Sequence, residues 1–131
     1  MTAEHKIEFK VLDSSLEDSE DFSLALARLL HEAVQEGASM GYLLETPIGQ
    51  LQAFWTGVLA KIAKGSGKLV FALENGALVG AVFLSFEENP NASHRAEVKK
   101  LLVAREHRGQ GIAKKLLSIV EMEARISKRT L

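Results

Sequence analysis

The sequence predicts one mixed α/β domain of the α+β type over residues 1–131, with strands and helices in the order βααβββα. Segments in which apolar and polar residues alternate, typical of strands, are interleaved with longer segments in which apolar residues recur every three or four positions, typical of helices. A chain of this length falls within the usual size of one domain, about 100–200 residues. We therefore expect one hydrophobic core enclosed by a single sheet and its helices.

The first half of the chain supplies one strand and two helices. Residues 6–11 alternate between apolar and charged side chains, which predicts a strand with one solvent-exposed face. Residues 22–34 carry an apolar stripe that predicts a helix, with Ser19 as its cap. Residues 48–62 carry a second such stripe, after Thr46 as a cap and Pro47 in the first turn. These three elements precede the segments that form the rest of the sheet.

The second half supplies three strands and a helix. Lys68–Glu74 and Ala77–Glu88 are rich in strand-forming residues and are separated by Asn75-Gly76, which predicts an antiparallel hairpin. Arg95–Ala104 is a fourth strand, and because its last four residues are apolar on both faces we expect it to be central in the sheet. Gly111–Ser127 predicts the third helix.

The composition excludes several classes of protein. Apolar residues make up 47% and charged residues 25% of the chain, as in ordinary globular domains. The absence of cysteine rules out thiol nucleophiles, Cys-ligated zinc and iron–sulfur clusters, and we expect no metal site. The longest uncharged apolar stretch, residues 77–86, is far shorter than the roughly 20 residues that span a bilayer. The first ten residues lack the apolar segment of a signal peptide, so we expect a cytoplasmic protein with no membrane partner.

The net charge of −1 conceals an asymmetry along the chain. Residues 1–94 hold 6 Lys/Arg and 13 Asp/Glu, a net −7, whereas residues 95–131 hold 10 and 4, a net +6. The basic residues are spread through an apolar pattern and do not form a run. This favours a small anionic ligand or a solvated helix face over nucleic acid.

The segment with the clearest chemistry runs from a buried strand through a short loop into a helix, over residues 101–117. Gly109 and Gly111 lie at the start of the helix, where bare backbone N–H groups at the positive end of the helix dipole bind phosphate oxygens. Lys114 stands where a dinucleotide-binding fingerprint requires glycine or alanine, so that motif is excluded. The alternative is that the glycines only allow close helix packing.

The loop Arg108-Gly109-Gln110-Gly111-Ile112-Ala113 resembles the R/Q-x-x-G-x-G/A pyrophosphate loop of the GNAT superfamily of N-acetyltransferases, and the element order matches the N-terminal half of that fold. Within the family, residues 96–103 before the loop look like the bacterial branch that includes tabtoxin-resistance-type acetyltransferases. The resemblance is more specific over residues 68–127 than over residues 1–67.

The resemblance implies that acetyl-CoA is the co-substrate. Its pyrophosphate would lie on backbone amides of the loop, its pantetheine arm would pair with the exposed backbone of Leu101 and Val103, and a backbone N–H near Leu102 or Val103 would hold the oxyanion. The cofactor-binding residues expected on this basis are Leu101, Leu102, Val103, Arg108, Gly109, Gly111, Ala113 and Lys114.

The resemblance also implies transfer of an acetyl group to a primary amine of an unidentified small-molecule or N-terminal acceptor. An amine with a pKa near 10.4 must lose a proton before it attacks the thioester, and we expect Glu97 to act as the base because it is a charged residue in an apolar strand. The alternative is that Glu97 pairs with Lys99 or Arg95 on a solvated face.

Three other side chains have structural explanations, and a fourth is a candidate for an acceptor pocket. We expect His94 and His107 to be surface residues, since nothing near them forms a ligand set. Trp55 lies on an apolar helix stripe, which favours a place in the core, and Tyr42 remains a candidate for the wall of an acceptor pocket.

The family's fold continues past the third helix with a fifth strand, a fourth helix that carries a tyrosine general acid, and a hairpin. The fifth strand would begin at or just after Leu131, so we expect a truncated chain with little transferase activity, or a homodimer joined through the edge of the fourth strand. A non-catalytic protein of the same fold that binds acetyl-CoA or a partner is the alternative function. An RNA-binding module is disfavoured because this chain lacks the exposed aromatic platform that such modules need.

Overall fold

The computed structural model describes residues 6–13, 20–37, 42–92 and 94–131. Within them the chain forms β1 (Ile7–Leu12), α1 (Glu20–Gln35), α2 (Ile48–Ala63), β2 (Gly67–Glu74), β3 (Ala77–Phe86), β4 (Ala96–Val103) and α3 (Ile112–Ile126). The predicted order βααβββα is confirmed, and the boundaries agree within about two residues, the usual uncertainty of element ends. Ser19, the expected cap of the first helix, lies outside the described residues.

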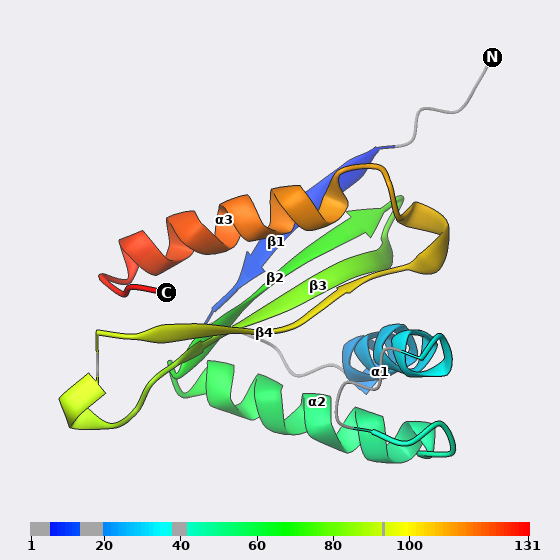
Figure 1. Ribbon diagram of the computed structural model, residues 1–131, viewed down its shortest axis with the longest axis horizontal. Coiled ribbons are helices and arrows are strands. Elements are labelled where there is room, and N and C mark those ends of the chain that lie inside the picture. The colour runs from blue at the N-terminus through cyan, green and yellow to red at the C-terminus, as the bar shows by residue number, and fades with distance from the viewer. Residues whose placement is uncertain (1–5, 14–19, 38–41, 93) are drawn as a thin grey trace.

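In the part of the chain that the structure describes, four strands form one antiparallel sheet in the order β1-β2-β3-β4. Helix α3 covers one face of the sheet, and α1 and α2 cover the other (Figure 1). Each face has its own apolar cluster, one under α1 and α2 and one under α3. Trp55 is fully buried in the first cluster, as expected for a core residue.

Local sequence signals explain most of the turns. Asn75 and Gly76 have φ angles of 50° and 85°, the left-handed pair that a tight hairpin turn requires, and β2 pairs with β3 as predicted. The prediction for the start of α2 was wrong by one residue. Pro47 occupies the cap position, and the Thr46 hydroxyl accepts a hydrogen bond from the N–H of Leu43 (3.1 Å).

The expectation that the fourth strand is central was wrong, because β4 lies at the end of the described sheet. The side chains at its end are apolar on both faces because helices cover both faces there. Leu102 packs in the cluster under α1 and α2, whereas Val103 packs in the cluster under α3. Only the beginning of β4 has an outer neighbour among the described residues, a parallel bridge between Arg95 and Thr130. This bridge places the last residues of the chain where the family's fifth strand was expected.

A β-bulge interrupts the pairing of β3 with β4. Ala81 pairs with Leu102 and Phe83 pairs with Lys99, which leaves Lys100 and Leu101 opposite Val82 alone. Lys100 has a left-handed φ of 55°, an uncommon conformation for a residue with a side chain. The extra residue reverses the alternation of β4, so that residues 96 and 98 before the bulge and residues 101 and 103 after it face α3.

Helix α3 lies close to the sheet at its first turns. A Cβ atom added to Gly80 of β3 would lie 3.1 Å from Ile112 Cγ2 and 3.2 Å from Leu116 Cδ1, so the approach depends on the missing side chain. Nearer the other end of α3, Lys68 Nζ lies 2.8 Å from Glu123 Oε1, and both side chains are largely buried. These contacts fix the position of the α3 N-terminus relative to β4.

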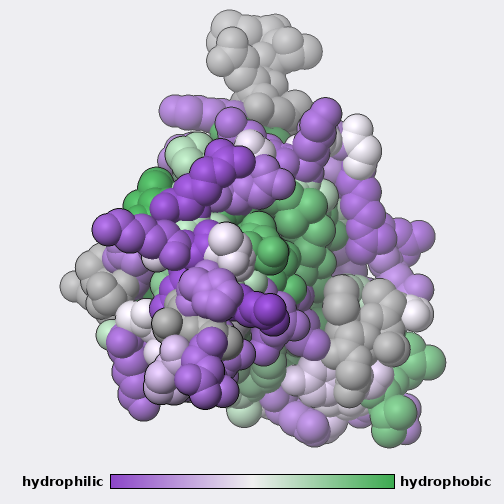
Figure 2. All heavy atoms as spheres, turned by 60° about the vertical axis from the view of Figure 1, so that its left-hand side comes forward, coloured by the Kyte–Doolittle hydropathy of each residue, from purple (hydrophilic) through white to green (hydrophobic). Residues whose placement is uncertain are grey.

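Polar and apolar side chains both reach the surface. Figure 2 shows a largely hydrophilic face with apolar atoms exposed among charged and polar ones. Exposed large apolar residues include Leu117, Met122 and Ile126 on α3. Among the described residues, no helix has both the length and the apolarity to cross a bilayer.

The first prediction tests the close approach of α3. Gly80→Ala should destabilise the fold by about 1–3 kcal/mol, because the added methyl group overpacks the interface between β3 and α3. Gly57→Ala is the control, since Gly57 lies within α2 with no atom near its would-be Cβ, and should stabilise the fold by about 0.5–1 kcal/mol. Urea denaturation midpoints measure both changes. A neutral Gly80→Ala substitution would show that α3 can move without cost.

Candidate functional site

The predicted phosphate-binding loop connects β4 to α3. After β4 the chain forms a 3-10 turn at Arg105–His107, and Gly109 and Gly111 then adopt left-handed φ angles of 80° and 81°. Gly111 occupies the N-cap of α3, where no side chain caps the helix. The first N–H groups of a helix have no partner within the helix, so these amides remain available as donors. An added Cβ at either glycine would meet no atom within 4 Å, so the space beside the amides is open.

The loop forms one wall of a cavity of about 700 Å³. All eight residues expected to bind the cofactor line it: Leu101, Leu102, Val103, Arg108, Gly109, Gly111, Ala113 and Lys114. The end of helix α1 and the residues directly after it also line the cavity, through Ala33, Glu36 and Gly37. The structure therefore brings the predicted set together and adds residues that lie far away in the sequence.

The outer edge of β4 contributes backbone groups to this cavity. The N–H of Ala104 donates to the carbonyl of Val79 (2.8 Å), so Ala104 and Leu102 direct their backbone groups towards β3. By the same alternation, Leu101 and Val103 direct theirs away from the sheet. The Val103 carbonyl indeed accepts a hydrogen bond from Nε of Arg108 (3.2 Å). Leu102 is consequently a poorer source of an outward N–H donor than its two neighbours.

Arg108 is engaged by protein groups in this cavity. Besides its bond to Val103, its guanidinium forms an ion pair and hydrogen bond with Glu36. Glu36 also lies 3.6 Å from Nε of Arg105. One helical turn earlier, the Glu32 carboxylate accepts the backbone N–H of Arg105 (2.6 Å). Two acidic residues, one in the last turn of α1 and one directly after it, therefore hold the segment that leads into α3.

The expectation that both histidines are surface residues was wrong for His107. His94 is exposed, but the His107 side chain is 17% exposed, and its Nε2 lies 3.1 Å from Oε2 of Glu74. Nδ1 of His107 is buried and has no hydrogen-bond partner. His107 lines the cavity and links the loop to the end of β2.

Sequence reasoning did not find Glu32, Glu36 or the His107–Glu74 pair. Their partners lie tens of residues away in the sequence, so no local spacing indicates the contact. One signal was present for Glu36, an acidic residue just after the end of α1, where the negative end of the helix dipole disfavours a carboxylate.

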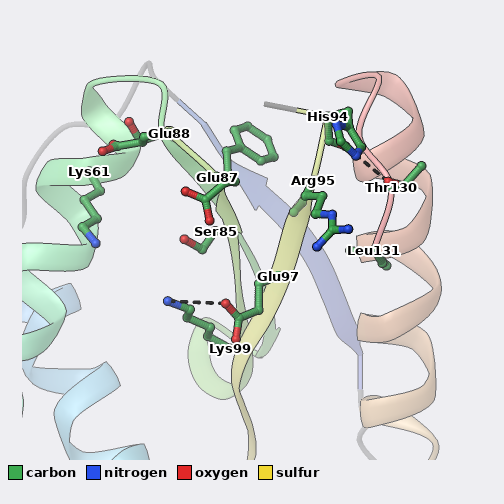
Figure 3. A pocket seen from close by; sticks show the side chains of 13 residues that line it. Lys61, Ser85, Glu87, Glu88, His94, Arg95, Glu97, Lys99, Thr130 and Leu131 are labelled. Atoms are coloured by element: carbon green, nitrogen blue, oxygen red, sulfur yellow. Dashed lines mark hydrogen bonds and ion pairs between the residues drawn. The ribbon is translucent and has the colours of Figure 1, made fainter. Parts of the chain in front are cut away.

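Glu97 lies apart from the other predicted site residues. It lines a second cavity, of about 670 Å³, between β4, the end of β3 and the C-terminal part of α2. Figure 3 shows Glu97 and Lys99 on β4, with their charged groups joined by a dashed line, and Lys61 extending from α2 into the same space. Glu97 Oε2 lies 3.8 Å from Nζ of Lys99, and its side chain is 73% exposed. The expected burial of a charge in a central strand is therefore wrong, and the pairing with Lys99 is present.

The bulge places Lys100 against aromatic rings. Its Nζ lies 5.5 Å from the centre of the Tyr42 ring and 5.4 Å from that of Phe54, within the range of cation–π attraction. Burial lowers the pKa of the Lys100 ammonium below its ordinary value, and the neighbouring charge of Lys99 lowers it further. Tyr42 thus contacts the residue that precedes the expected pantetheine-binding segment.

The fold and site define a class of protein, an α+β domain with an open cavity between a strand edge and an uncapped helix N-terminus. Residues 32–129 match the model of the Acetyltransferase (GNAT) family. The chain therefore belongs to the GNAT family of acetyltransferases.

Solved structures share this fold at low sequence identity. A Staphylococcus aureus protein described as a GNAT-family acetyltransferase superposes with a TM-score of 0.72 at 16% identity, over 93% of this chain and 94% of its own. The PaiA N-acetyltransferase from Thermoplasma acidophilum, solved with coenzyme A, gives 0.68 at 16% identity, over 93% and 74%. A ribosomal-protein-alanine N-acetyltransferase from Brucella melitensis gives 0.64 at 20% identity, over 95% and 76%.

The second prediction tests the amide cradle. Gly111→Ala should weaken the binding of coenzyme A at least about tenfold, because the methyl group enters the space beside donors whose bonds to a charged group are each worth about 1.5–3 kcal/mol. Gly65→Ala is the matched control, with a φ of 83° and open space around its would-be Cβ, but a position outside the cavity. Both should lose about 1–2 kcal/mol of stability from left-handed strain. Calorimetric titration and thermal melts would measure the two effects, and equal affinities would reject the cradle.

Proposed function

We propose that the chain is an acetyl-CoA-dependent N-acetyltransferase acting on a primary amine. The observation that carries this proposal is the cavity in which an uncapped helix N-terminus, two left-handed glycines and an open strand edge meet. Membership of the family supports the reaction class, and a family neighbour solved with coenzyme A supports the ligand.

The residues of the cavity fit the chemistry of coenzyme A. The amides of Gly109, Gly111 and Ala113 would hold the pyrophosphate, with Lys114 adding positive charge. The outward backbone groups of Leu101 and Val103 would pair with the amide-bearing pantetheine arm as a further strand does. Bound acetyl-CoA supplies the reactive thioester.

Backbone donors of β4 would stabilise the charge that develops on the attacked carbonyl. The alternation of the ladder favours the outward N–H of Leu101 or Val103 over that of Leu102, which is directed towards β3. A preorganised backbone donor of this kind contributes roughly 2.7–4 kcal/mol to catalysis in enzymes where one has been removed. Because the donor is a backbone group, its position depends on the bulge and not on a side chain.

Glu97 would accept the proton of the incoming ammonium, directly or through water. It precedes Leu101 by four residues, at most about 13 Å along an extended strand, and it lines a cavity that opens on the α2 side. We infer that the acceptor approaches through this second cavity while the cofactor occupies the first. Nζ of Lys99 lies 3.8 Å from the Glu97 carboxylate and lines the same cavity.

The third prediction separates this role from simple pairing. Glu97→Gln should lower the rate of transfer by about 10²-fold at neutral pH, with a smaller loss at high pH where the acceptor is already deprotonated. Lys99→Gln, which breaks the same ion pair but keeps the carboxylate, should change the rate by less than about fivefold, because an exposed pair is worth at most about 1 kcal/mol. The assay follows the release of free coenzyme A from acetyl-CoA with a panel of small amines and peptides.

The alternative function has a distinct outcome in the same experiment. The exposure of Glu97 is the observation that favours it, since an exposed carboxylate paired with lysine is also an ordinary surface feature. Binding of coenzyme A without transfer to any amine in the panel would support a non-catalytic binding protein. Equal rates for the wild type and Glu97→Gln over pH 6–9 would remove Glu97 from the mechanism.

A further inference from the structure

The cofactor cavity contains an acidic side chain. Glu36 lies directly after α1, and its N–H still bonds to the carbonyl of Glu32 (3.1 Å). The last turn of α1 carries no basic residue, so the carboxylate meets the negative end of the helix dipole without local compensation. An arrangement that local helix physics disfavours is retained where tertiary contacts or function require it.

Positive charges on the loop that leads into α3 compensate the negative charge of the Glu36 carboxylate. Oε2 of Glu36 bonds to the guanidinium of Arg108, and Oε1 lies 3.6 Å from Nε of Arg105. The Glu36 side chain is 22% exposed, and that of Arg108 is 47% exposed. Ion pairs that are partly removed from solvent are screened less than surface pairs. Arg108 is therefore held by Glu36 on one side and by the Val103 carbonyl on the other.

Glu36 and Arg108 line the same cavity as Gly109 and Gly111. A phosphate group held by the loop amides would share this cavity with the Glu36 carboxylate, and like charges brought together in a partly buried site repel each other. A phosphate oxygen and the Glu36 carboxylate would also compete for the same guanidinium.

We propose that Glu36 lowers the affinity of the coenzyme A site for anions, by holding Arg108 and by placing a negative charge in the cavity. This inference rests on the proposed function. Simple anions gain only from charge, and Glu36 opposes that gain. Coenzyme A also gains from the edge of β4 through its uncharged pantetheine arm, a contribution that Glu36 does not oppose.

The test compares two variants that each remove one negative charge at or just after the end of α1. Glu36→Gln should tighten the binding of both coenzyme A and inorganic pyrophosphate by about five- to tenfold, because the repulsion is lost and Arg108 is released. Glu32→Gln is the matched control. Glu32 contacts the backbone of Arg105 and does not line the cavity, so its loss should not tighten binding. Dissociation constants come from calorimetry at one fixed ionic strength.

Every outcome bears on the proposal. Tightening by Glu36→Gln alone supports it, and Glu36→Ala should then change affinity in the same direction, provided that thermal melts show both variants folded. Weaker binding by Glu36→Gln would overturn it and make Glu36 a positioning residue for Arg108. Equal tightening by both variants would also overturn it, since the effect would then reflect net charge. Unchanged constants overturn this inference alone, whereas no binding of coenzyme A by any of the proteins overturns the proposed function as well.

Discussion

The extra residue in β4 controls the geometry of the site, because it changes which face of the sheet each later side chain occupies. Before the bulge, Ala96 and Val98 face α3, and after it Leu101 and Val103 do. A regular strand would have placed Leu102 under α3 instead. The left-handed conformation of Lys100 is the local cost, and cation–π contacts with Tyr42 and Phe54 offset part of it. The bulge therefore decides which face of the sheet the last side chains of β4 occupy, just before the loop to α3.

Part of the charge asymmetry along the sequence is taken up by contacts within the protein. Acidic residues of the first 94 positions contact basic residues of the last 37, as in Glu36 with Arg108 and Glu74 with His107. Each of these contacts ties the loop before α3 to an element formed earlier in the chain. Part of the positive charge near the cavity is thus already engaged by the protein. The net charge of a segment consequently overestimates the positive charge that is available to an anionic ligand.

The two cavities divide the domain into regions with different physical character. The cavity at the start of α3 combines backbone donors with an apolar wall, which suits a ligand with a charged end and a neutral arm. The cavity beside Glu97 is lined mostly by charged and polar side chains, including Lys61 of α2 and Glu87 and Arg95 between β3 and β4. Solved neighbours with 16–20% identity keep the same fold. Apolar pattern and turn chemistry therefore specify the framework without requiring a closely similar sequence.

The sequence alone determined the features that depend on local physical chemistry. Alternation and helical spacing predicted the element order, Asn75-Gly76 predicted the hairpin, and the glycine pattern at 109 and 111 predicted an open helix N-terminus, all from interactions within a few residues. The bulge is also visible in the sequence, since the apolar positions change from even numbers (96 and 98) to odd numbers (101 and 103). Tertiary structure decided the rest. It placed β4 at the edge of the described sheet, exposed Glu97, buried His107 and brought Glu36 to Arg108. These outcomes depend on which elements pack together across long sequence separations, and no local pattern encodes that choice.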